Sequence, residues 1–231
     1  MDAKDVLATT WTLSDLIDQK KIFKDNHVLD LACHDGQSSS IIKKSGAQSV
    51  TGIEVRENLV DQAKSCYGKE ITFLLGDITD ADLMKKYVAT HDVVVALGVL
   101  YHLYDHFNFL SLILRPNVKH VILETLYGPE SLSPGMFWGF ESVFSDINGW
   151  NNELDVIPHG TPNLSWILQV ADLFGFSCDY VRKYYRTTNW DQPDNSRMVI
   201  RLFNRKSIIS QSLRIEDIYE WNNNQLVIGD I

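Results

Sequence analysis

The sequence has few cysteines, no long apolar run and a deficit of positive charge. Three cysteines stand far apart in 231 residues, at Cys33, Cys66 and Cys178, which argues against a disulfide framework and indicates reduced thiols. No apolar run is long enough to cross a membrane, and the amino terminus lacks the basic and apolar regions of a signal peptide, so we expect a soluble, cytoplasmic protein. Lys and Arg total 21 against 30 Asp and Glu, a formal net charge of -9. This balance argues against nucleic acid or a membrane as a partner and favours a small-molecule substrate.

The chain also lacks a long linker rich in proline, glycine or serine, and it contains no internal repeat or low-complexity tract. We therefore expect a single domain over residues 1–231. Within it, residues 1–25 read as a helical flank, 126–160 as an aromatic-rich insertion and lid, and 205–231 as a tail. The sequence leaves the oligomeric state open.

Apolar stretches of strand length alternate with stretches of helical periodicity through the first half of the chain. Continuous apolar runs such as DVVVAL are typical of parallel strands that are covered on both faces. The expected parallel strands are 27–31, 50–55, 71–75, 92–97 and 120–124. A helix from Thr161-Pro162 to Phe174 and antiparallel strands at 176–185 and 197–203 complete the pattern. The order predicts an α/β fold with a doubly wound, mostly parallel sheet.

The stretch NHVLDLACHDGQSS, residues 26–39, combines a strand, a tight turn and a helix start. In an open α/β sheet such a turn lies at the carboxyl end of a strand, where free backbone N–H groups face a crevice for a nucleotide-like ligand. Asp30, Glu54 and Asp77 stand at or just past the ends of successive strands, so we expect them on one rim with Gly36. Glu54 is placed to accept hydrogen bonds from two ribose hydroxyls, and Asp77 to accept one from an adenine amine.

The series VLDLACHDG, GIEV, GDITD and HDVVVALGVLYH resembles the motifs of the class I S-adenosylmethionine-dependent methyltransferases over residues 26–124, and more loosely to Phe203. The first motif of that family has three glycines, whereas Ala32 and His34 stand at two of these places here and only Gly36 remains. The resemblance implies a Rossmann-like sheet of seven strands with an antiparallel last strand. It also implies S-adenosylmethionine as cofactor, S-adenosylhomocysteine as product and no metal. The cofactor-binding residues that it implies are Asp30, Ala32, His34, Gly36, Glu54, Asp77, Ile78 and Leu97.

Tyr101 and His102 follow the fourth strand, and the resemblance places them beside the sulfonium methyl group. Tyr101 can offer its ring face or its hydroxyl to the cation, and His102 is a candidate general base for a hydroxyl acceptor. The alternative is that both are cap and packing residues of the next helix. His102 and His106 also have the spacing of two metal ligands on one helix face, but no third ligand cluster accompanies them. Transfer by direct displacement needs alignment and exclusion of water rather than a covalent nucleophile.

Aromatic and polar residues in the second half of the chain form the expected acceptor pocket, and their abundance suggests a flat or apolar acceptor methylated at oxygen or nitrogen. These residues are Tyr127, Trp138, Trp150, His159, Asn163, Tyr185 and Trp190.

A narrower similarity, in LGVLYH, LETL and HGTPNLSWILQVADLFGF, is to the catalytic domain of the bacterial wobble-uridine carboxymethyltransferases and to related small-molecule methyltransferases. Three alternatives to a small-molecule methyltransferase therefore stay open. They are a tRNA wobble-uridine-modifying enzyme, which would need a local basic groove, a nicotinamide-dependent oxidoreductase, which would need a complete G-x-G-x-x-G turn, and a non-catalytic nucleoside-binding protein.

Overall fold

A seven-stranded sheet forms the centre of the structure. The computed structural model describes residues 22–129, 132–142, 156–185 and 196–207. The strands lie in the order β3-β2-β1-β4-β5-β9-β8. Their bounds are β1 (His27–Leu31), β2 (Ser49–Glu54), β3 (Thr72–Leu75), β4 (Val93–Leu97), β5 (His120–Leu126), β8 (Phe176–Tyr185) and β9 (Ser196–Asn204). Strands β1 to β5 run parallel, β9 is antiparallel to β5, and β8 is antiparallel to β9. The predicted Rossmann-like, mostly parallel sheet with an antiparallel last strand is confirmed.

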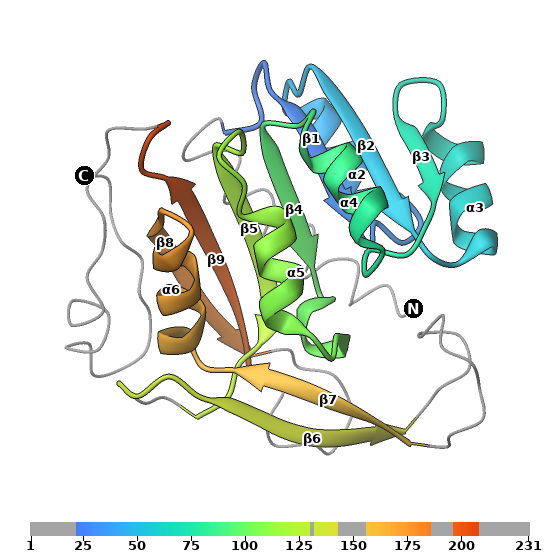
Figure 1. Cartoon of the computed structure of the whole chain (residues 1–231). Helices are drawn as coiled ribbons and strands as arrows, with labels where there is room; N and C mark the ends of the chain where they lie inside the picture. Colours follow the sequence, from blue (N-terminus) through green and yellow to red (C-terminus); the bar gives the residue numbers. More distant parts are fainter. Residues whose placement is uncertain (1–21, 130–131, 143–155, 186–195, 208–231) are drawn as a thin grey trace.

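Helices cover both faces of this sheet (Figure 1). On one face pack α4 (Ala81–Val88), α5 (His106–Ile113) and α6 (Leu164–Leu173); on the other pack α2 (Gln37–Lys44) and α3 (Glu57–Tyr67). Successive side chains of a strand point to opposite faces, so Leu29 joins the first core and Val28 the second. The middle strand, β4, is apolar throughout because neither of its faces meets water.

The parallel strands all end at one edge of the sheet, and a second, two-stranded sheet lies across that edge (Figure 1). The second sheet pairs β6 (Met136–Ser142) with β7 (Val156–Pro162) in antiparallel register. Strand β7 contacts β5 and also the short 3-10 helix η1 (Leu100–His102), which follows β4. The described part of the aromatic-rich insertion is thus placed over the carboxyl ends of β4 and β5.

The predicted start of the last helix was wrong. Thr161 and Pro162 end β7, where Pro162 pairs with Met136, and α6 begins only at Leu164. Asn163 is the N-cap, because its side-chain oxygen accepts a hydrogen bond from the backbone N–H of Trp166 at 2.9 Å. A threonine followed by a proline is a local signal for a helix start. Here pairing of Pro162 with Met136, 26 positions earlier in the sequence, overrides that signal.

Most of the two expected terminal segments lies outside the described residues. The described part of the chain contains no helix with the length and apolar character needed to cross a bilayer.

Candidate cofactor and acceptor site

The turn after β1 is held in an uncommon backbone conformation. Ala32 and His34 have φ of 54°, and Gly36 has φ of 82°, so three of five consecutive residues are left-handed. Residues other than glycine pay a steric penalty in this conformation, so the backbone is strained at Ala32 and His34. A Cβ atom on Gly36 would also lie 2.8 Å from Cζ of Phe73 and 3.0 Å from Cβ of Ala63. Glycine is required at position 36 for both reasons.

Three of the N–H groups of this turn already have acceptors within the protein. Those of Cys33 and Gly36 donate to the carbonyls of Ile53 and Cys33, and that of His34 donates to Oε2 of Glu54 at 3.0 Å. The sequence predicted free N–H groups facing a ligand, but these three are used within the protein. Through them the turn is linked directly to the end of β2.

Glu54, the last residue of β2, is the most heavily hydrogen-bonded side chain of the rim and is only 1% exposed. Its Oε1 accepts from the backbone N–H groups of Val55 and Arg56 and from Nε of Arg56 at 2.7 Å. Its Oε2 accepts from His34 N and from Nη2 of Arg56. Burial alone would raise the pKa of Glu54, but the hydrogen bonds and charge of Arg56 hold it below its ordinary value. Glu54 is therefore an ionised carboxylate at neutral pH.

Asp30 and Asp77 have different surroundings. Asp30 is buried, and its Oδ2 accepts from the hydroxyls of Ser38 and Ser39 at 2.7 and 2.6 Å, so it fastens the first turn of α2 to β1. Burial raises the pKa of Asp30 to about 6, against the effect of the two serine hydrogen bonds. Asp77 is exposed beyond β3 and accepts from the backbone N–H and hydroxyl of Thr79.

The rim is continuous from β1 to β3. His34 bonds to the Glu54 side chain, and the N–H of Gly76, next to Asp77, donates to the Glu54 carbonyl at 3.0 Å. Ile78 is buried in the core beside this rim, and Leu97 ends β4 in a half-buried position. Two apolar side chains that the sequence reasoning missed stand exposed here: Val55 (43%) directly after β2 and Leu75 (51%) at the end of β3.

This arrangement fits a nucleoside. It combines an ionised carboxylate that vicinal hydroxyls can reach once they displace the guanidinium of Arg56, apolar side chains suited to the faces of a flat ring and an exposed acid beyond them. The tight Gly36 turn lies alongside, where a larger residue would collide with Phe73.

Tyr101 and His102 lie on η1, next along the same edge. Their ring centroids are 4.1 Å apart, and Tyr101 is buried. Nη2 of Arg197, from the start of β9, donates to the Tyr101 hydroxyl at 3.0 Å. Nη1 of Arg197 donates to both carboxylate oxygens of Glu124, near the end of β5, at 3.1 and 3.2 Å. Sequence reasoning missed both partners, although Glu124 carries the same signal as Glu54: an acid closing an apolar strand.

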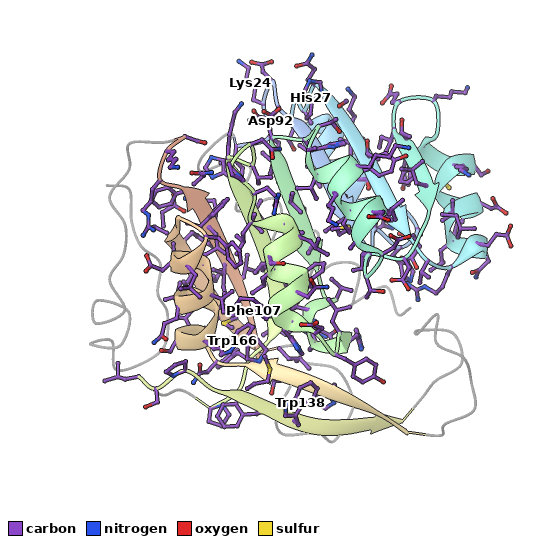
Figure 2. All side chains as sticks on the ribbon, viewed as in Figure 1. Lys24, His27, Asp92, Phe107, Trp138 and Trp166 are labelled. Atoms are coloured by element: carbon purple, nitrogen blue, oxygen red, sulfur yellow. The ribbon has the colours of Figure 1, made fainter. Side chains whose placement is uncertain are left out.

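The acceptor residues predicted from sequence are only partly gathered. Trp138 of β6 is 55% exposed and lies edge-on to His106, with 5.7 Å between ring centroids. Figure 2 shows Trp138 together with Trp166 and Phe107 at the end of the molecule where β6 and β7 lie. His159 of β7 packs over Gly139 of β6. The exposed Trp138 ring is the strongest candidate for contact with an acceptor.

Of the other predicted acceptor residues, Asn163 and Tyr127 make contacts within the protein, and two lie outside the described chain. The side-chain amide of Asn163 makes hydrogen bonds within the protein. Its oxygen caps α6 and also accepts from the backbone N–H of Gly135, and its nitrogen donates to the carbonyl of Ser133. Tyr127 has the ammonium of Lys183 5.2 Å from its ring centroid. Tyr185 is the last residue of β8. Trp150 and Trp190 lie outside the described residues.

No metal site is evident in the described residues, where no group of three His, Cys, Asp or Glu side chains is suitably clustered. His106, considered above as a ligand partner for His102, instead uses Nε2 to donate to the carbonyl of Gly160 at 3.1 Å. Burial lowers the pKa of His106, which favours the neutral ring.

Comparisons with known proteins find methyltransferases. Residues 28–116 match the family described as a methyltransferase domain. The ubiquinone biosynthesis O-methyltransferase of Coxiella burnetii is 30% identical over 160 residues, which is 68% of this chain and 63% of that protein. The chain thus matches somewhat less than two thirds of the length of that relative.

Solved structures share the fold at low sequence identity. Magnesium protoporphyrin IX methyltransferase from Synechocystis PCC 6803, with bound S-adenosylhomocysteine, aligns with a TM-score of 0.59 at 19% identity over 87% of this chain and 84% of that chain. A putative S-adenosylmethionine-dependent methyltransferase from Listeria monocytogenes aligns with a TM-score of 0.62 at 15% identity, over 86% and 99%. These likenesses establish the fold.

Proposed function

We propose, from the membership of residues 28–116 in the methyltransferase-domain family, that this chain is an S-adenosylmethionine-dependent methyltransferase acting on a small molecule. The observation that carries the proposal is the hydrogen bond between His34 N and Glu54 Oε2. It joins the left-handed turn after β1 to the ionised acid that ends β2, at the edge where a doubly wound sheet binds nucleotides.

Each rim residue has a separate part in cofactor binding. Glu54 accepts hydrogen bonds from the ribose hydroxyls, and Asp77 accepts one from the adenine amine. Val55 and Leu75 cover the faces of the adenine ring. Gly36, Ala32 and His34 shape the turn against which the methionine part lies, with Leu97 and Ile78 completing the wall. Asp30 acts through Ser38 and Ser39, by holding α2 against that turn.

The bound cofactor supplies an activated methyl group on a sulfonium, and the protein contributes alignment and exclusion of water. Tyr101 is held beside the end of β4 with its ring next to that of His102. Its electron-rich face or hydroxyl oxygen stabilises the positive charge of the sulfonium. His102 accepts the proton of a hydroxyl acceptor as the new bond forms.

The acceptor that fits best is a flat or apolar small molecule, methylated at oxygen. Strand β7 rests on η1, so the β6–β7 sheet brings Trp138 to the side of the site where Tyr101 and His102 lie. The names of two relatives, which refer to ubiquinone biosynthesis and to magnesium protoporphyrin IX, denote small-molecule metabolism. The relatives do not favour a tRNA substrate or a loss of catalysis.

Calorimetric titration of the full chain with S-adenosylmethionine and S-adenosylhomocysteine tests this proposal. We expect micromolar binding that falls at least tenfold in Glu54→Ala and less in Asp77→Ala, because Glu54 would address two hydroxyls and Asp77 one amine. Asp82→Ala, which removes an exposed acid on α4, is the matched control and should bind normally. Absence of binding, or preferential binding of a nicotinamide dinucleotide, would overturn the proposal.

Turnover is tested by following S-adenosylhomocysteine formation with a panel of phenols, catechols and aromatic amines, and separately with unmodified tRNA. Product formation with a member of the small-molecule panel supports the assigned acceptor class. Turnover with tRNA alone would move the protein to the tRNA-modifying alternative, and binding without turnover on either would favour the nucleoside-binding protein.

A further inference from the structure

The pair Glu124–Arg197 is a buried ion pair at the carboxyl edge, and neither residue is among those assigned above to cofactor binding. Glu124 lies on β5 and Arg197 on β9, and both side chains are nearly inaccessible to solvent. Replacing one member of a buried pair is costly because the other charge is left uncompensated. Glu124 pairs in register with Leu97, the last residue of β4, so this ion pair lies at the end of the strand that leads into η1 and calls for an explanation beyond packing.

The guanidinium of Arg197 also binds a residue of the proposed site, Tyr101. Nη1 is occupied by the two oxygens of Glu124, while Nη2 donates to the Tyr101 hydroxyl at 3.0 Å. The guanidinium carbon also lies 5.1 Å from the centroid of the Tyr101 ring. Because guanidinium is a planar fork that can only donate, fixing one arm on Glu124 fixes the direction of the other.

Tyr101 is thereby fixed at its hydroxyl end as well as at its backbone. Its oxygen is the acceptor in the bond with Arg197, so its own O–H proton points away from Arg197. Gly98, with φ of 69°, makes the bend from β4 into η1, and a Cβ there would lie 3.3 Å from Glu124 Oε2 and 3.7 Å from the Tyr101 hydroxyl oxygen. The bend, the ion pair and the tyrosine form one closely packed unit.

We propose that Arg197, clamped by Glu124, is a positioning residue that holds Tyr101, and through it the η1 turn bearing His102, in the geometry required for methyl transfer. The inference rests on the proposed function, because it takes Tyr101 to lie beside the sulfonium methyl. It adds two residues, from strands at a long sequence distance, to the machinery of that site. Both Glu124 and Arg197 lie outside residues 28–116, the part of the chain that matches the methyltransferase-domain family.

The test uses S-[methyl-¹³C]adenosylmethionine bound to the full chain, observed by NMR. An aromatic ring beside the methyl group displaces its resonance, so the bound signal reports where the Tyr101 ring lies. We expect Arg197→Lys and Tyr101→Phe each to move the bound methyl resonance relative to the wild type, with S-adenosylhomocysteine affinity changed less than about threefold. Lysine keeps a positive charge beside Glu124 but has no planar fork to serve both oxygens.

Arg201→Lys is the matched control. Arg201 lies four residues further along β9, is fully buried and is held by Asp179 with hydrogen bonds of 2.6 and 2.9 Å. Its replacement removes a buried guanidinium further along the same strand and should leave the bound methyl resonance unchanged. Thermal unfolding of all variants separates a loss of folding from a change in the site.

The outcomes are distinct. If the wild-type chain does not bind S-adenosylmethionine, the proposed function itself is overturned. A wild-type chain that binds, with the same bound methyl resonance in Arg197→Lys as in wild type, overturns the positioning role alone. An equal displacement in Arg201→Lys would also overturn it, since the effect would then be a general consequence of losing a buried arginine. In the double variant Arg197→Lys/Tyr101→Phe, the displacement should not exceed that of Tyr101→Phe, because the two residues act as one unit.

Discussion

Arg56 donates from Nε and Nη2 to the carboxylate of Glu54, at 2.7 and 3.2 Å, from only two residues along the chain. Three backbone N–H groups donate to the same carboxylate, so five donors address the roughly four lone-pair positions that it offers. Ribose hydroxyls bind a carboxylate by donating to it. A nucleoside can therefore reach Glu54 only by replacing the guanidinium of Arg56.

Replacing Arg56 with glutamine should increase affinity for S-adenosylhomocysteine, because the competing charged donor is removed while most of the aliphatic stem remains. Loss of charge-assisted hydrogen bonds of about 1.5–3 kcal/mol, partly offset by the weaker amide, corresponds to roughly a tenfold gain. Calorimetry measures the change. Lys85→Gln, at an exposed ion pair with Asp82, is the control and should have no effect. Weaker binding in Arg56→Gln would show that Arg56 holds Glu54 in place for the ligand rather than competing with it.

The turn glycine gives a second prediction. Gly36→Ala should destabilise the protein and abolish cofactor binding, because the new Cβ meets both a left-handed backbone and the Phe73 ring. The backbone conformation alone costs about 1–2 kcal/mol. Gly175→Ala separates the two causes, since Gly175 has nearly the same φ, 81°, and nothing within 4 Å of its Cβ position. Urea unfolding should show a clearly larger loss for Gly36→Ala; equal losses would mean that Phe73 moves aside at no cost.

The sheet could be predicted from the sequence because its strands are continuous apolar runs, and a run such as residues 92–97 has few other stable environments. The rim acids Glu54 and Asp77 followed from the rule that parallel strands end at one edge. The Glu54–Arg56 pair could not be predicted, since Arg56 follows the end of β2 as the N-cap of α3, where strand periodicity no longer fixes the direction of a side chain. The Tyr101–Arg197 contact joins residues 96 apart and depends on the register of β9 against β5.

The insertion was the least predictable part. Its prolines, glycines and aromatic residues indicated an interruption of the regular pattern, but strands β6 and β7 are defined by pairing with each other rather than by local propensity. The same pairing took Pro162 out of the expected first turn of a helix. Strand propensity depends on such neighbours more than helix propensity does.

Asp30 gives a prediction about pH. Its pKa is raised from 3.8 to about 6 in the folded protein. Between these values the folded state holds more protons than the unfolded state, so Asp30 lowers the free energy of unfolding as pH rises from about 4 to 6, and the loss is complete above pH 6. The difference corresponds to roughly 3 kcal/mol.

Asp30→Asn should remove this contribution, because the amide keeps an oxygen to accept from Ser38 and Ser39 and carries no charge. We expect the variant to be more stable than wild type at pH 7 and nearly equal to it at pH 4. Urea unfolding at several pH values measures the difference between the two proteins, in which the effects of other titrating groups cancel. A difference that does not vary between pH 4 and 7 would contradict the assignment.

The final prediction concerns how β7 is held to α5. The ring of His106, the first residue of α5, lies so close to Gly160 of β7 that a Cβ on Gly160 would be 2.4 Å from its Cε1. Gly160→Ala should therefore force the ring out of its place, break the hydrogen bond to the Gly160 carbonyl and cost about 1–3 kcal/mol. In the double variant His106→Ala/Gly160→Ala the collision is absent. Adding Gly160→Ala to the His106→Ala variant should therefore lower the free energy of unfolding much less than adding it to the wild type does. Urea unfolding gives both costs, and hydrogen exchange at the β6 and β7 amides should rise in each single variant. If Gly160→Ala costs as much with His106 absent as with it present, the histidine ring does not pack where the structure places it.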